Sequence, residues 1–102
     1  MLTLKVVTTD HNDDVLTTLF SGDSISHTEG VMGGTDVKNY PNSRHVGYIN
    51  NASEQKFISS NVLILNDDAS LKYDLLILPK SDCYIMEGGK TVDTFYSYFK
   101  EV

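Results

Sequence analysis

The sequence predicts an all-β fold: a small antiparallel meander that forms a sandwich or partly open barrel of about six to seven strands. Apolar and polar residues alternate with a period of two in several short segments. Asn, Asp and Gly residues gather between these segments, as they do in turns. No segment keeps the helical period for three turns. We therefore expect a single β-rich domain over residues 1–102.

The N-terminal part predicts three short strands. Alternation places the first at residues 2–9, and the Asp- and Asn-rich segment 10–14 is a turn. The β-branched and aromatic residues of 15–20 then complete a hairpin with the first strand. A second turn over residues 21–23 leads to a short strand at 24–28, which extends the meander.

The pattern breaks in the middle of the chain, over residues 29–54. A strand signature survives only at 44–49, and the rest is punctuated by Gly30, Gly33, Gly34 and Pro41. We expect a long glycine-rich loop that is mobile over residues 30–48 in the free protein and becomes ordered by whatever the protein binds.

Regular patterning returns in the C-terminal half. Strands are expected at 56–65, 71–78, 83–87 and 90–99, with a turn at 66–70. Pro79 ends the second of these strands because it lacks a backbone N–H. Gly88 and Gly89 can both adopt positive φ, so the last two strands form a C-terminal hairpin.

The charge balance restricts the partners. Eight basic and 14 acidic residues leave a net charge of −6, which opposes direct binding to nucleic acid and to anionic membranes. The longest apolar runs are far shorter than the roughly 20 residues of a membrane-spanning helix. Cys83 is the only cysteine, and no basic, then apolar leader opens the sequence. These features favour a cytoplasmic protein.

Asp10, Asn12 and Asp14 match the opening of a calcium-binding loop. The match ends there, because Val15 and Ser21 occupy the positions where such a loop needs glycine and a bidentate glutamate. The segment therefore favours a solvated turn over a calcium site.

The three histidines, His11, His27 and His45, could meet Glu29 or Asp36 around a transition metal. Their spacing does not require it, because they lie on separate expected elements. We favour structural histidines and expect no bound metal.

Cys83 is the one candidate nucleophile. It lies in an apolar strand next to Asp82 and near Glu87, and neighbouring carboxylates raise a thiol pKa. No other pattern indicates a catalytic residue or a cofactor. The prediction is a protein that is not an enzyme.

A small-ligand or metal-binding protein is an alternative function. Its site would use the loop of residues 30–48 and the histidines, with Gly33, Gly34, Arg44 and His45 as candidates. The loop lacks the lysine and the following helix of a phosphate-binding loop, which favours a flexible turn.

The leading hypothesis is a protein-binding or inhibitory module. Carboxylates and tyrosines recur in the C-terminal half, and the candidate contact residues are Asp67, Asp68, Asp74, Tyr84, Tyr96 and Tyr98. Tyrosine joins a large apolar area to a hydrogen-bonding tip, and carboxylates steer a basic partner. The expected partner is another protein with a basic surface, such as a nucleic-acid-binding site that the module would block.

In size, acidity and Asn-, Asp- and Tyr-rich composition, the sequence resembles small bacteriophage-encoded proteins, including those that block host defences. That resemblance implies an inhibitory role and assigns no residue. A third alternative is a homo-oligomeric structural or assembly protein, in which an exposed edge strand pairs with another copy.

Overall fold

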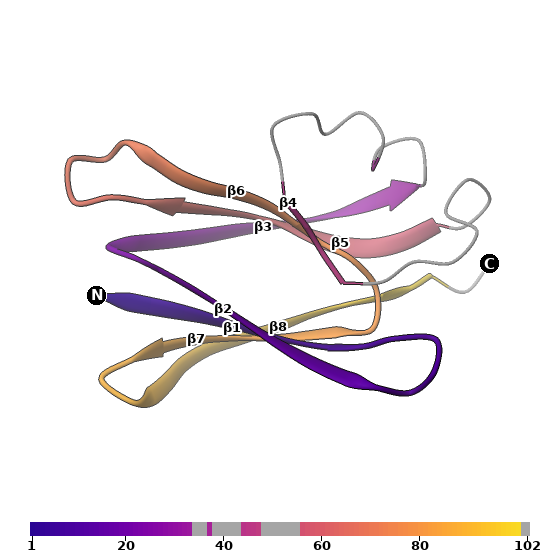
Figure 1. The fold of residues 1–102 in the computed structure, drawn as a ribbon. Coiled ribbons are helices and arrows are strands. Elements are labelled where there is room, and N and C mark those ends of the chain that lie inside the picture. The colour runs from indigo at the N-terminus through magenta and orange to yellow at the C-terminus, as the bar shows by residue number, and fades with distance from the viewer. Residues whose placement is uncertain (34–36, 38–43, 48–55, 101–102) are drawn as a thin grey trace.

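The computed structural model describes residues 1–33, 37, 44–47 and 56–100, and it confirms the all-β prediction. Figure 1 shows the strands arranged in two layers joined into one curled sheet that forms a half-barrel. The described residues form eight strands: β1 (Leu2–Thr9), β2 (Val15–Gly22), β3 (Ser24–Gly33), β4 (Arg44–Val46), β5 (Lys56–Leu65), β6 (Leu71–Ile77), β7 (Ser81–Glu87) and β8 (Lys90–Phe99).

The strand order along the sheet is β2-β1-β7-β8-β5-β6-β4, and β3 pairs with β5. β2, β1, β7 and β8 form one layer, which we call the front layer. β3, β5, β6 and β4 form the back layer (Figure 1). The layers are joined where Phe57 and Ile58 of β5 pair with Phe99 and Tyr98 of β8. All pairings are antiparallel except that of β4 with β6. No helix in the part of the chain that the structure describes could cross a membrane.

The predicted hairpins form for the local reasons that the sequence indicates. In the β1–β2 turn, Asp10 Oδ1 accepts hydrogen bonds from the backbone N–H groups of Asn12 and Asp14, at 2.8 and 2.9 Å. The Asp10 carboxylate therefore stabilises its own turn, in keeping with the turn that the sequence favours over a calcium site. In the β7–β8 turn, Gly88 and Gly89 have φ values of 57° and 80°, which confirms the two-glycine hairpin.

The main core lies between the layers. Its fully buried members come from both, and they include Leu4, Val6, Val62, Ile64, Leu75, Ile77 and Cys83. A second, smaller cluster of Phe57, Leu76 and Leu78 is packed against Met32, Val37 and Phe99.

The course of β3 differs from the expected meander. It does not pair with β2; instead the chain crosses to the back layer after Gly22, with only Asp23 between the strands, and β3 pairs with β5 along its length. Gly22 allows this crossing, because a Cβ there would lie 2.3 Å from Ile64 Cγ2. β3 also continues to Gly33, beyond the expected end at residue 28, because the ten-residue β5 offers a ladder partner as far as Lys56.

Most of the expected glycine-rich loop, residues 34–36, 38–43 and 48–55, lies outside the described residues, as do residues 101–102. The prediction that 30–48 is mobile therefore stays a prediction for most of that segment. Its first four residues belong to β3.

Candidate functional site

The outward-facing side of the front layer, here called the outer face, carries the exposed tyrosines. On β1 and β7, Val6 and Cys83 point into the core, so their neighbours Lys5 and Tyr84 point outward. The same alternation continues across β2 and β8. The outward-facing set includes Thr17, Leu19, Asp82, Met86, Thr94, Tyr96 and Tyr98.

Two tyrosines stand close together on this face. Tyr96 and Tyr98 are 58% and 42% exposed, and their ring centroids lie 5.1 Å apart. Tyr84 is half-buried on the adjacent strand, and Lys5 Nζ lies 5.7 Å from the centroid of its ring. Tyr84, Tyr96 and Tyr98, three of the predicted contact residues, therefore lie on the same face of the neighbouring strands β7 and β8.

A shallow pocket of about 210 Å³ opens beside these rings. Its lining includes Asp82, Tyr84, Thr94 and Tyr96. Asp82 is exposed and is paired in register with Tyr96, and Tyr84 is paired with Thr94. A carboxylate next to two aromatic rings suits an ammonium or guanidinium group, which gains a charge-assisted hydrogen bond and contact with the rings.

The other predicted contact residues lie elsewhere. Asp67 and Asp68 are exposed in the turn between β5 and β6, and Asp68 Oδ1 accepts a hydrogen bond from the Ser70 N–H. Asp74 is on the outward side of the back layer, where it accepts a hydrogen bond from Asn61 Nδ2 at 2.8 Å. The structure brings the tyrosines together and separates them from these carboxylates.

Asp82 is the carboxylate that the sequence-based selection omitted. Its signal is the two-residue step from Asp82 to Tyr84, which places both on one side of a strand. The glycine turn then folds Tyr96 back beside them.

The candidates for a loop site are only partly described. Gly33 ends β3 opposite Lys56, and Gly34 lies outside the described residues. Arg44 and His45 belong to β4 by their backbones, opposite Leu75 and Leu76.

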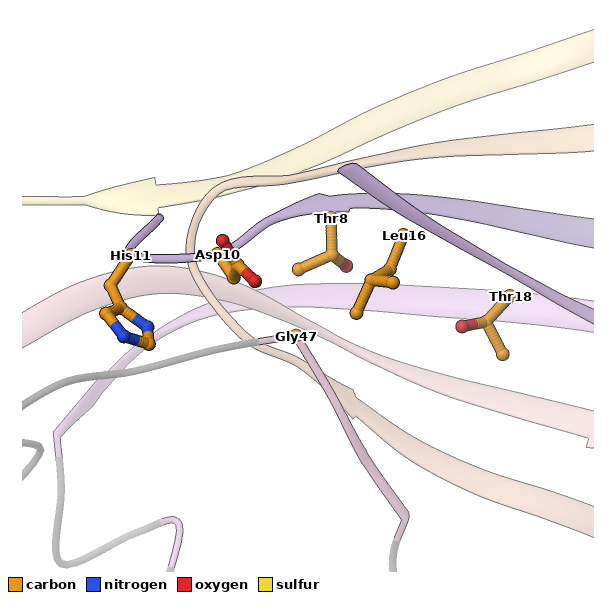
Figure 2. Close-up of a pocket in the computed structure, with 6 residues that line it drawn as sticks. All are labelled: Thr8, Asp10, His11, Leu16, Thr18 and Gly47. Carbon is orange, nitrogen blue, oxygen red and sulfur yellow. The ribbon is translucent and has the colours of Figure 1, made fainter. Parts of the chain in front are cut away.

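A second pocket, of about 230 Å³, lies at the side of the half-barrel where Gly47 faces β1 and β2 (Figure 2). Figure 2 shows Asp10 and His11 at one end and Thr18 at the other. Gly47 has φ of 118°, and a Cβ there would lie 2.8 Å from Ser81 Oγ. The Thr8 hydroxyl is hydrogen-bonded to that of Ser81 at 3.0 Å. Both this pocket and the pocket beside Tyr96 are below the roughly 300 Å³ at which small-molecule sites begin. This pocket is the weaker candidate for a protein contact, because its described lining contains no tyrosine.

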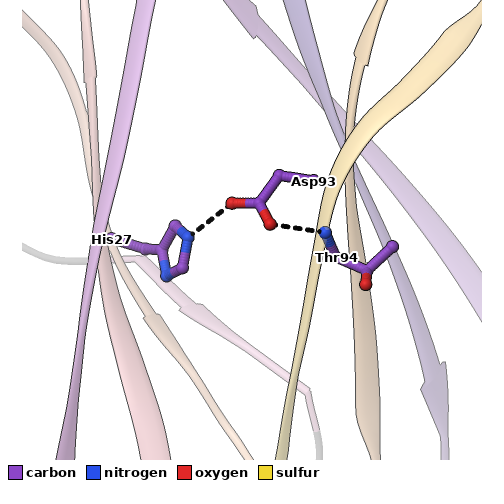
Figure 3. Close-up of polar contacts among 3 residues, drawn as sticks. All are labelled: His27, Asp93 and Thr94. Carbon is purple, nitrogen blue, oxygen red and sulfur yellow. Dashed lines mark hydrogen bonds and ion pairs between the residues drawn. The ribbon is translucent and has the colours of Figure 1, made fainter.

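His27 takes part in a contact between the two layers (Figure 3). Its Nε2 lies 2.9 Å from Asp93 Oδ2, and its ring stacks on Phe95 with centroids 4.0 Å apart. The hydrogen bond with His27, helped by that from the Thr94 N–H, lowers the pKa of Asp93. Within the described ranges, no three His, Cys, Asp or Glu side chains are grouped to hold a metal.

Cys83 is buried in the main core. Burial, and secondly the charge of Asp82, raise the pKa of its thiol to about 12. At neutral pH it is a protonated thiol, a poor nucleophile.

Comparison with protein families, curated proteins and solved structures gave no match for this chain.

Proposed function

We propose that this protein is a binding domain that holds a basic segment of another protein on its outer face. The pocket formed by Asp82, Tyr84 and Tyr96 receives a lysine or arginine side chain of that segment. The observation that carries the proposal is the exposed Asp82 carboxylate in one pocket with Tyr84 of its own strand and Tyr96 of the adjacent strand.

The energetics of such a contact are adequate for recognition. A cation over an aromatic ring contributes about 0.5–1 kcal/mol at an exposed site and about 2 kcal/mol when water is excluded. Because Lys5 Nζ already lies 5.7 Å from the centroid of the Tyr84 ring, the cation of the partner would contact the exposed ring of Tyr96 and the Asp82 carboxylate. Tyr98, adjacent to Tyr96, supplies apolar area of the kind that anchors protein interfaces.

Net charge adds long-range attraction. The chain carries −6, and the carboxylates Asp67, Asp68 and Asp74 lie away from the tyrosines, so they act on association through the overall field. A partner that uses the same basic segment to bind nucleic acid would be blocked while this protein covers it. The proposed role is therefore inhibitory towards such a partner.

The test is an NMR titration with two defined peptides of equal length, one rich in arginine and one in which glutamate replaces arginine. We expect the arginine peptide to shift the amide signals of Asp82, Tyr84, Thr94 and Tyr96, and the glutamate peptide to leave them unchanged. Tyr96→Leu should weaken arginine-peptide binding, whereas Val92→Ala, an exposed change on the same strand, should not. Shifts spread over all acidic turns, or equal affinity of the two variants, would contradict a site at this pocket.

A further inference from the structure

We propose that β2 is an interaction edge that pairs antiparallel with β2 of a second copy of this chain. Among the described residues, β1 is the only strand paired with β2, so β2 ends the strand order of the sheet. It is eight residues long and contains no charged residue and no proline. Natural proteins protect edges with such residues, and an edge without them is a template for another strand.

The other edges of the described sheet are β3 and the three-residue β4, and β3 differs from β2 in its residues. β3 pairs only with β5 in the described part of the sheet, but it carries Glu29 and contains Gly30, which weakens a strand. β2 instead exposes three large aliphatic side chains. Val15, Leu16 and Leu19 are 62%, 61% and 64% exposed.

The sequence of β2 is complementary to itself in one register. A two-fold axis perpendicular to the sheet makes the two strands antiparallel and keeps both outer faces on the same side. With the axis at Thr17, Val15 of each copy lies opposite Leu19 of the other, and Leu16 lies opposite Thr18. These are apolar and β-branched cross-strand pairs, which stabilise antiparallel sheets.

Charge also favours the antiparallel arrangement. Asp13 and Asp14 immediately precede β2, and both are exposed. A parallel pair of β2 strands would bring the two acidic turns side by side. The antiparallel pair places Asp13 and Asp14 of each copy opposite Ser21 and Phe20 of the other, so no two carboxylates lie directly opposite each other. Asp23, which follows β2, lies opposite His11 of the other copy.

The pairing would extend the front layer into one continuous sheet with the order β8-β7-β1-β2-β2-β1-β7-β8. At about 4.8 Å per strand, the two β8 strands would lie roughly 34 Å apart along the sheet, with both tyrosine pockets on one side. This consequence rests on the proposed function, although the pairing itself does not. A partner with two basic segments would then bind with avidity.

The register is tested by disulfide formation. In Thr17→Cys the introduced thiols of the two copies lie directly opposite each other, with Cβ atoms about 4.5–5.5 Å apart. The native Cys83 is buried, so it does not compete. We expect covalent dimers to form under mild oxidation at least about tenfold faster than with Thr91→Cys, an exposed position on β8. A mixture of Val15→Cys and Leu19→Cys proteins should give the cross-linked heterodimer.

The affinity is tested by analytical ultracentrifugation. The unmodified protein should show a concentration-dependent dimer, and Leu19→Lys should weaken it on the order of tenfold or more, because each dimer loses two Val–Leu pairs. Val92→Lys makes the same kind of change at an exposed position on β8 and should leave the dimer unchanged. A monomer at all concentrations, or equal cross-linking of Thr17→Cys and Thr91→Cys, would overturn the pairing. Neither result would affect the peptide titration, so the two proposals fail separately.

Discussion

The two layers of the half-barrel differ in how far the large side chains on their outward sides are exposed. In the back layer, Phe57 and Leu76 are completely buried and Leu78 nearly so, because they pack with Met32, Val37 and Phe99. On the front layer, Leu19, Tyr96 and Tyr98 remain exposed. Both layers follow the same two-residue alternation, so the difference lies in whether other parts of the chain cover the face.

That difference separates residues that stabilise the fold from residues available to a partner. Covered side chains lose contact with water when the chain folds, and they contribute to the free energy of unfolding. Exposed rings gain little from folding and can gain from binding. Substitutions on the back layer should therefore change stability, and those on the outer face should change binding.

The largest expected effect is on the covered cluster. Phe57→Ala should lower the free energy of unfolding by about 3–5 kcal/mol, because it removes a fully buried ring. Tyr96→Ala should lower it by less than about 1 kcal/mol. Urea unfolding of both variants measures the contrast. Equal losses would show that the two faces do not differ in the way the exposures indicate.

The next effect concerns the turn that brings β8 beside β7. Gly89→Val should destabilise by on the order of 1–3 kcal/mol, because valine disfavours the φ of 80° found there. Gly88→Asn is the matched control and should be close to neutral, since asparagine tolerates the first position of this turn. Thermal unfolding compares them. An unchanged melting temperature for Gly89→Val would mean that the turn does not determine the hairpin.

The smallest effect is the pH dependence of the contact between the layers. The hydrogen bond with His27 lowers the pKa of Asp93, so ionised Asp93 stabilises the fold above its ordinary pKa. That contribution is lost as the pH falls through the lowered pKa, below about pH 4. The stability difference between the native protein and Asp93→Asn should therefore shrink in acid. A difference that stays constant from neutral pH down to about pH 3 would contradict this role.

Local signals in the sequence predicted most of the strands and hairpins. The glycines of the last hairpin and the Asp-rich first turn act on their own backbones, so their effect is visible in a short segment. The crossing of β3 was not predictable in this way. It depends on the contact of Gly22 with Ile64, a residue far along the chain and in the other layer.

The tyrosines of the candidate site could be predicted from local patterns, whereas the carboxylate beside them could not. Alternation along β8 placed Tyr96 and Tyr98 on one side, and the hairpin placed Tyr84 next to them. The carboxylate-rich turn at residues 66–70 predicted Asp67 and Asp68 as contact residues, but this turn joins β5 and β6 of the back layer. Which carboxylate lies beside the rings depends on strand register, and register favours Asp82.

The most direct test of the proposed site is therefore the affinity of the arginine peptide for two variants that lose the same charge. Asp82→Asn removes the carboxylate in the pocket, and Asp67→Asn removes one in the β5–β6 turn. Isothermal titration calorimetry at physiological salt should show a loss of about tenfold or more for Asp82→Asn, typical of a lost charge-assisted hydrogen bond. It should show less than about twofold for Asp67→Asn, whose exposed charge is screened over about 8 Å. Equal losses for the two variants would mean that net charge alone attracts the peptide, and would contradict the site at Asp82, Tyr84 and Tyr96.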